Sequence, residues 1–408
     1  MSKRNIIILI LSLTILALAG AFTSYLLTTG EKTPQDFEEL RDFFPFGEEP
    51  ETTTRELERG EVIEEVTETP EIITDTDFPI LRQISRDPIS GAVTELQEDG
   101  SYLIRFIQKS NGHIYETETN RLTQKRISNT TIPKIYDADW LNINSLIIRY
   151  LDDNDQETIK TFVAQIKKND LEETNLEGIF FPDNITQIAH NKEKIFYLTN
   201  TENNSLGILT NIEGDTPTQI FSSPFNEWLI NWAGGDIITL TTKPSNGVDG
   251  YVYSLNSRTE KFDKILGEID GLLTLLSPNS SKLIYSVNNK SGITSFLYDL
   301  QTNESIETPF GIIPEKCTWG KESIYIYCGI PANKLTGDYP DEWYQGLEST
   351  TDEVWKIDVE NDFFDFLASP RDLLNTEIDA INLILSENED YLFFTNKKDL
   401  TLWSLKLK

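Results

Sequence analysis

The sequence predicts an all-β fold, a seven-bladed β-propeller of four-stranded antiparallel blades, and three observations support this prediction. From Phe78 onward, short runs of β-branched and aromatic residues alternate with turns rich in Asn, Asp, Gly and Ser. This alternation is typical of short β-strands. A unit made of a short apolar run, a polar turn and a longer apolar run recurs seven times. Its spacing is close to the length of a propeller blade, about 40–45 residues.

The seven repeats align on the residue that precedes each polar turn. These marker residues are Leu96, Trp140, His190, Trp232, Ser277, Trp319 and Ser386. Their successive spacings are 44, 50, 42, 45, 42 and 67 residues. We attribute the long sixth spacing to an insertion over residues 331–353, so seven markers predict seven blades.

The seventh blade contains only three strands from its own repeat, because the chain reaches Lys408 after the third apolar run. An open strand edge would promote aggregation, so another segment is expected to cover it. The run PILRQIS at 79–85 lies directly before the first blade. We expect it to supply the missing strand and to close the ring by pairing the two ends of the propeller.

In LSPNSSKLIYSVNNKSGITSFLYDLQT at 276–302, a turn that begins with Ser-Pro leads into an apolar strand and then into a strand with an aromatic-Asp pair, and LSENEDYLFFTN at 385–396 is a second, looser copy. These repeats resemble those of TolB-type propellers, whose turn is Ser-Pro-Asp-Gly-like, with Asn279 here in place of the Asp. The whole chain also resembles uncharacterised bacterial propeller proteins with a single membrane anchor. This resemblance implies an architecture and a location, but no activity.

The N-terminus has the features of a signal anchor. Residues 6–27 carry no charge and follow Lys3 and Arg4. We expect residues 1–5 to be cytoplasmic and residues 6–28 to span the membrane, which places the rest of the chain outside the cell membrane. The alternative is a cleaved signal peptide, for which Ala17-Leu18-Ala19 would serve as the cleavage site.

The segment 29–77 is predicted to be an acidic, disordered linker before a propeller at 78–408. Residues 31–77 contain 17 acidic and 4 basic residues, and self-repulsion extends such a chain. The whole protein has a formal net charge of −32. This charge argues against nucleic acid as a partner, because phosphate binding depends on clusters of Lys and Arg.

The two cysteines flank one predicted hairpin, CTWGKESIYIYC. If its turn is centred on Glu322-Ser323, Cys317 and Cys328 face each other on adjacent strands, and an exported protein can oxidise them. We therefore expect a disulfide. The alternative is a pair of small buried thiols.

The sequence contains no GxSxG, HExxH or P-loop motif, and its two histidines, His113 and His190, lie in different repeats. Without these motifs, a Ser-His hydrolase or a zinc hydrolase is not expected. We predict no catalytic residue, cofactor or metal site. A catalytic pair of carboxylates, as in glycosidases, remains an alternative in so acidic a chain, although no two residues are singled out for it.

The insertion at 331–353 is the strongest candidate for a binding loop. Long loops within compact domains are often functional, and this one places aromatic rings among hydrogen-bonding side chains. The candidate ligand-binding residues are Asp338, Tyr339, Asp341, Glu342, Trp343, Tyr344 and Gln345. The alternative is that Trp343 holds the loop over the central channel as a packed lid.

These expectations combine into a function hypothesis. The chain is expected to be a binding or scaffold module at the cell envelope, anchored in the membrane by its N-terminal helix, with a protein or glycan ligand on one face of the propeller. The alternative is an enzyme that cleaves envelope polysaccharide or peptide with carboxylates on the same face.

Overall fold

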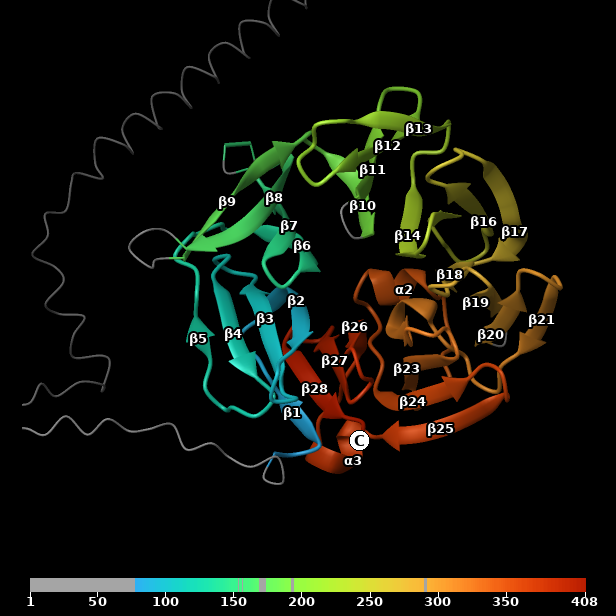
Figure 1. Cartoon of the computed structure of the whole chain (residues 1–408). Helices are drawn as coiled ribbons and strands as arrows, with labels where there is room; N and C mark the ends of the chain where they lie inside the picture. Colours follow the sequence, from blue (N-terminus) through green and yellow to red (C-terminus); the bar gives the residue numbers. More distant parts are fainter. Residues whose placement is uncertain (1–77, 153, 156, 169–173, 192–193, 290–291) are drawn as a thin grey trace, which may run out of the picture. The chain divides into compact units, whose positions relative to one another are not determined.

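The computed structural model describes residues 78–408 apart from 153, 156, 169–173, 192–193 and 290–291. Over this range the strands form seven four-stranded antiparallel sheets in a ring around a central axis (Figure 1). The predicted seven-bladed propeller is therefore confirmed. The predicted membrane helix at 6–28 and the linker at 29–77 lie outside the described residues. Within the described residues, no helix is long and apolar enough to cross a membrane.

The first three blades follow the chain from the inner strand to the outer strand. Blade one consists of β2 (Ile89–Leu96), β3 (Tyr102–Gln108), β4 (Ile114–Glu118) and β5 (Lys125–Arg126). Blade two consists of β6 (Ile135–Asn142), β7 (Ser145–Leu151), β8 (Ile159–Lys168) and β9 (Thr174–Phe181). Blade three consists of β10 (Ile185–Asn191), β11 (Lys194–Asn200), β12 (Ser205–Asn211) and β13 (Thr218–Ser223).

The next three blades have the same order. Blade four consists of β14 (Trp228–Gly234), β15 (Ile237–Thr242), β16 (Asp249–Asn256) and β17 (Phe262–Asp270). Blade five consists of β18 (Leu273–Leu276), β19 (Lys282–Asn289), β20 (Gly292–Asp299) and β21 (Glu304–Glu307). Blade six consists of β22 (Cys317–Trp319), β23 (Tyr325–Pro331), β24 (Asp352–Asp358) and β25 (Phe363–Ala368).

Blade seven combines the two ends of the propeller. It consists of β26 (Ala380–Leu385), β27 (Tyr391–Asn396), β28 (Leu402–Lys406) and, as the outer strand, β1 (Leu81–Gln83). Strand β1 pairs antiparallel with β28 in the register Leu81 to Leu405. The predicted closure by residues 79–85 is confirmed, and β1 covers the edge that β28 would otherwise expose.

Burial decreases from the centre of each blade to its outer edge. The second strands are the most buried, as in β7, where the first five of seven residues are buried. The outer strands are exposed, as in β21, where all four residues are. A strand with neighbouring blades on both faces has a continuous apolar run, whereas an outer strand does not need one. This difference explains why the fourth strands are the weakest signals in the sequence.

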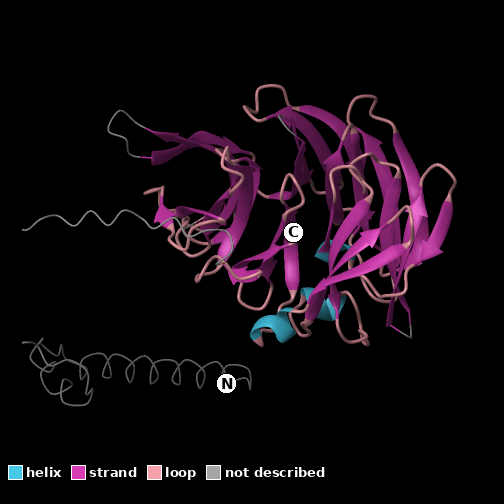
Figure 2. Ribbon diagram, turned by 60° about the horizontal axis from the view of Figure 1, so that its bottom comes forward, coloured by secondary structure: helices cyan, strands magenta, loops and turns pink. Residues whose placement is uncertain are grey.

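Few helices interrupt the strands in the part of the chain that the structure describes. They are a 3₁₀ turn, η4 (Pro314–Lys316), and the short helices α2 (Asp341–Tyr344) and α3 (Pro370–Leu374). Figure 2 shows the short helices in cyan against the magenta strands. Helix α3 begins at Ser369, whose side chain accepts a hydrogen bond from the backbone N–H of Asp372. These elements all lie in the segment that forms blade six and leads into blade seven.

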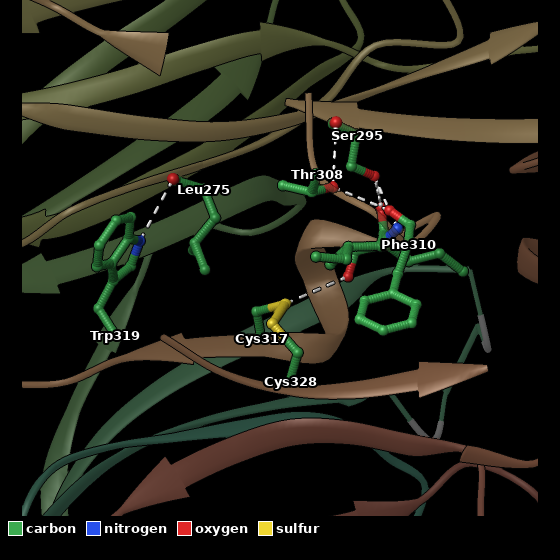
Figure 3. Close-up of a disulfide and its surroundings, with 9 residues drawn as sticks. Leu275, Ser295, Thr308, Phe310, Cys317, Trp319 and Cys328 are labelled. Carbon is green, nitrogen blue, oxygen red and sulfur yellow. Dashed lines mark hydrogen bonds between the residues drawn. A yellow bond between two sulfur atoms is a disulfide. The ribbon is translucent and has the colours of Figure 1, made fainter. Parts of the chain in front are cut away.

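The expected disulfide is present in blade six. Cys317 of β22 lies opposite Cys328 of β23, with their Cα atoms 4.1 Å apart, and the two sulfur atoms are bonded. Figure 3 shows the disulfide beside Trp319, whose indole N–H donates to the carbonyl oxygen of Leu275 on β18 at 3.4 Å. The inner hairpin of blade six is thus fixed covalently and is linked to blade five.

Candidate functional site

The predicted binding loop joins the second strand of blade six to the third, and its residues between β23 and β24 are 332–351, here called the rim loop. Connections of this type emerge on the same face of a propeller as the links between blades. We call this face, on which the inner strands begin, the upper face. Helix α2 lies within the rim loop, and Figure 1 shows it at the inner edge of the ring, next to the central axis.

Two of the predicted ligand-binding rings are buried. The exposed fraction of Tyr339 is 3% and that of Trp343 is 2%. Both rings pack in a small apolar cluster with Leu273 of blade five and Ile313 before blade six. Burial raises the pKa of Tyr339 to about 12, and the nearby carboxylates add to the rise. The rim loop is therefore fixed over the ring by two aromatic side chains, which is the packed arrangement left open as an alternative for Trp343.

Two of the predicted carboxylates attach the rim loop to blade four. Asp341 accepts hydrogen bonds from the Ser245 hydroxyl at 2.9 Å and the Asn246 backbone N–H at 2.6 Å. Asp338 accepts a hydrogen bond from the Asn246 side chain at 2.6 Å. On blade five, the Asn288 side chain donates to the carbonyl oxygen of Tyr339 at 2.6 Å. The loop from blade six thus extends across blades five and four.

The other three predicted residues differ in their environment. Glu342 accepts a hydrogen bond from the backbone N–H of Asp338 at 3.2 Å and so stabilises the loop internally. Gln345 is exposed, and Tyr344 has an exposed fraction of 37%. The Tyr344 hydroxyl donates to the carboxylate of Glu315. Of the seven predicted residues, Asp338, Tyr344 and Gln345 are exposed, and the last two lie on α2 and at its C-terminal end.

A cavity of about 460 Å³ lies beside α2. Its lining residues come from blades three to seven and include Asn231, Glu315, Trp343, Tyr344, Asn382 and Lys397. Aromatic, carboxylate, amide and ammonium groups are thus available to one ligand. Burial raises the pKa of Glu315, although the hydrogen bond from Tyr344 opposes the rise. Burial lowers the pKa of Lys397, against the attraction of Asp379.

Beneath the rim loop lies a buried charge cluster made of Lys316, Asp352 and Asp379, whose exposed fractions are 0%, 1% and 0%. The Lys316 ammonium contacts Asp352 Oδ2 at 2.7 Å and also contacts Asp379 Oδ1. The indole N–H of Trp343 donates to both oxygens of Asp379, at 3.2 and 3.1 Å. The cluster connects η4, β24 and the residue before β26, and Trp343 attaches the rim loop to it.

The two carboxylates of the charge cluster differ in their pKa. Burial raises the pKa of Asp352, although the charge of Lys316 opposes the rise. Burial also acts to raise the pKa of Asp379, but Lys316, the Thr350 backbone N–H and the Trp343 indole outweigh burial and lower it. Desolvation thus prevails at Asp352, whereas the charge of Lys316 and the hydrogen bonds to the carboxylate prevail at Asp379.

A second cavity, of about 750 Å³, adjoins the first, since Asn231 and Asn382 line both. It contains Asp137 and Asp139 from β6 and His190 from β10. His190 Nε2 lies 3.2 Å from Asp139 Oδ2. Burial opposes charging of the imidazole, but the hydrogen bond and charge of Asp139 outweigh burial and raise the pKa of His190. Burial and the charge of Asp139 raise the pKa of Asp137.

Sequence reasoning assigned no role to Glu315, Lys316, Asp379 or Lys397. A charged pair in the otherwise apolar segment GIIPEKCTW is the one signal that marks Glu315 and Lys316. Nothing in the sequence indicates that Asp139 and His190 meet. In the part of the chain that the structure describes, no group of three or more His, Cys, Asp and Glu side chains is arranged to hold a metal ion.

No model of a protein family matches the sequence, and a search of curated proteins finds no match. Solved structures with similar folds include the propeller domain of the Trilobed protease from Pyrococcus furiosus, with 9% identity, a TM-score of 0.49 and coverage of 78% of this chain and 96% of that one. Oligogalacturonate lyase in complex with manganese has 11% identity, a TM-score of 0.45 and coverage of 79% and 97%. TolB from Acinetobacter baumannii has 11% identity, a TM-score of 0.40 and coverage of 77% and 79%. These neighbours include enzymes and other proteins.

Proposed function

We propose that this protein is a binding or scaffold module at the cell envelope, anchored by residues 6–28, which binds a protein or glycan on the upper face of its propeller. The observation that carries the proposal is the cavity beside α2, where the exposed Tyr344 lies next to Glu315 and Lys397. A half-exposed ring beside paired hydrogen-bonding groups is suited to a sugar ring or a peptide side chain.

The fixed position of the rim loop supports binding. Trp343 and Tyr339 pack the loop against the ring, and Asp341 joins it to blade four by a hydrogen bond. A preformed surface loses little conformational entropy when it binds, so more of the contact energy contributes to affinity. Tyr344 and Gln345 then act as ligand contacts, and the five other predicted residues act as the support that positions them.

The test uses a panel of soluble envelope glycans and peptidoglycan fragments, titrated against the purified full chain. Tyr344→Ala is expected to weaken binding of a positive ligand by about 10-fold or more, as for an aromatic hot spot. Leu347→Ala is the matched control, because Leu347 is 71% exposed on the same loop and does not line the cavity. An equal affinity in the two variants would exclude Tyr344 as a contact.

The location is tested separately. A protease added to intact cells should remove the propeller, because Lys3 and Arg4 are expected to keep the N-terminus in the cytoplasm. If the propeller and a cytoplasmic marker are both protected, while an outward-facing marker is digested, the proposed orientation is wrong.

One observation favours a second candidate function, an enzyme that cleaves envelope polysaccharide or peptide. Asp137, Asp139 and His190 share the 750 Å³ cavity, and a carboxylate–imidazole pair can act as a general base. Asp139→Asn separates the two candidates. An enzyme of this kind would lose turnover of a cleaved glycan or peptide, whereas a binding protein would keep its affinity at α2.

A further inference from the structure

The charge cluster has an unbalanced composition for a fully buried site. It contains one ammonium, from Lys316, and two carboxylates, from Asp352 and Asp379, and each of the three residues is at most 1% exposed. Buried charges are stable only when they are closely paired, and an odd carboxylate adds to the cost of desolvation. A reaction that turns the Lys316–Asp379 ion pair into a neutral amide would remove the desolvation cost of these two charges. It would leave Asp352, whose pKa is raised by burial, as a single carboxyl group that can take up a proton.

The geometry places an amine against a carboxyl carbon that has its own hydrogen-bond donors. Lys316 Nζ has three partners, which are Asp379 Oδ1, Asp352 Oδ2 and the Thr350 hydroxyl. On the other side of the Asp379 carboxylate, Oδ2 accepts hydrogen bonds from the Thr350 backbone N–H at 3.1 Å and the Trp343 indole N–H at 3.1 Å. Two N–H donors on one oxygen form the arrangement that stabilises an oxyanion during acyl transfer.

Asp352 is positioned to carry protons between the reacting groups. Its Oδ2 lies 2.7 Å from Lys316 Nζ, and its Oδ1 accepts a hydrogen bond from the Thr350 hydroxyl at 2.7 Å. Burial raises the pKa of Asp352, so its carboxyl group can both accept a proton and return it. The site thus contains a nucleophile, an electrophile, an oxyanion site and a proton carrier within one buried cluster.

We propose that Lys316 and Asp379 condense in the folded protein to form an intramolecular amide bond, with Asp352 as the catalytic residue. The proposal is independent of any ligand on the upper face. It assigns to the charge cluster a self-catalysed modification that links the turn before blade six to the start of blade seven.

The reaction needs no other reagent. A proton passes from the Lys316 ammonium to the Asp379 carboxylate, and the neutral amine attacks Cγ. The N–C bond forms, and the negative charge develops on Oδ2, between the N–H groups of Trp343 and Thr350. Asp352 takes a proton from the attacking nitrogen and passes it to the Oδ1 hydroxyl. The C–O bond breaks, the carbonyl group is restored on Oδ2, and one water leaves.

Peptide mapping of the full chain, unfolded, reduced and digested with trypsin, tests the proposal. An amide blocks cleavage after Lys316, so peptide 291–321 should appear joined to peptide 372–397. Its mass should be the sum of the two minus one water molecule. Fragmentation should place the link between Lys316 and Asp379. Recovery of peptide 291–316 and unlinked peptide 372–397 in full yield would overturn the proposal.

Variants test the roles of the residues in the same assay. Lys316→Arg and Asp352→Asn should each abolish the linked peptide, while Lys397→Arg, which alters the neighbouring cation, should retain it. Near-ultraviolet circular dichroism shows whether each variant is folded. A link in full yield in Asp352→Asn, or no link in a folded Lys397→Arg protein, would refute the assigned reaction.

Discussion

Truncation of Trp343 tests how the rim loop is held. The ring is 2% exposed, packs against Leu273 and Ile313, and donates its indole N–H to the Asp379 carboxylate. Emptying a buried Trp site costs about 3–5 kcal/mol of unfolding free energy. Because Trp343→Ala also removes a donor from a buried carboxylate, we expect a loss near the upper end, about 5 kcal/mol.

Two further variants divide this loss into its parts. Trp343→Phe retains an aromatic ring but removes the N–H, so it should cost about 1–3 kcal/mol through the lost donor to Asp379. Leu347→Ala alters an exposed residue of the same loop and should change the unfolding free energy by at most about 0.5 kcal/mol.

The assay is denaturant unfolding of the full chain, followed by near-ultraviolet circular dichroism. Thermal unfolding should agree, with a fall in Tm of roughly 10 °C for Trp343→Ala, at about 2 °C per kcal/mol for a domain of this size. A loss below about 1 kcal/mol, comparable with that of Leu347→Ala, would refute the argument that the ring is a packed support.

Three other outcomes follow from the structure. Reduction of the blade-six disulfide should lower the unfolding free energy by about 2–3 kcal/mol, because the closed loop is short, and unfolding with and without reductant measures this. Since Asp139 raises the pKa of His190, their pairing stabilises the fold fully below the ordinary His pKa, and this contribution is lost as pH rises through the raised value. Asp139→Asn should lower the pKa of His190 in an NMR titration, and an unchanged pKa would contradict the pairing. Gly91→Ala should lower the unfolding free energy by about 3 kcal/mol or more in urea unfolding, because an added Cβ would lie 2.0 Å from the Ala138 carbonyl oxygen. An unchanged unfolding free energy would mean that the backbone of blade two at Ala138 can move aside at no cost.

The fold could be predicted because each blade repeats the same local signals. The markers Trp140 and Trp232 lie in the inner strands β6 and β14, close to the turn, as expected from the polar residues that follow them. The closure could be predicted as well, because a blade with three strands needs a fourth and the apolar run PILRQIS lies directly before the first blade.

The candidate site could be predicted only in part. The rim loop was found because an insertion interrupts a regular period. The charge cluster was missed because Lys316 and Asp379 are 63 positions apart and meet only when blades six and seven pack. The burial of Tyr339 and Trp343 could not be predicted from the sequence either. An aromatic residue among carboxylates has the same local sequence pattern whether its ring packs as a lid or contacts a ligand.

The charge cluster lies near the part of the ring where the chain does not continue from blade to blade. Blade seven is completed by β1, which pairs with β28 over three residue pairs and comes from the other end of the propeller. Asp379 directly precedes β26 of the same blade and is held by Lys316 from the turn before blade six. The side chain of Lys397, which follows β27, donates to the carbonyl oxygen of Trp343. The rim loop therefore rests on the junction of blades six and seven, and any change that loosens this junction should also displace Tyr344 and its cavity.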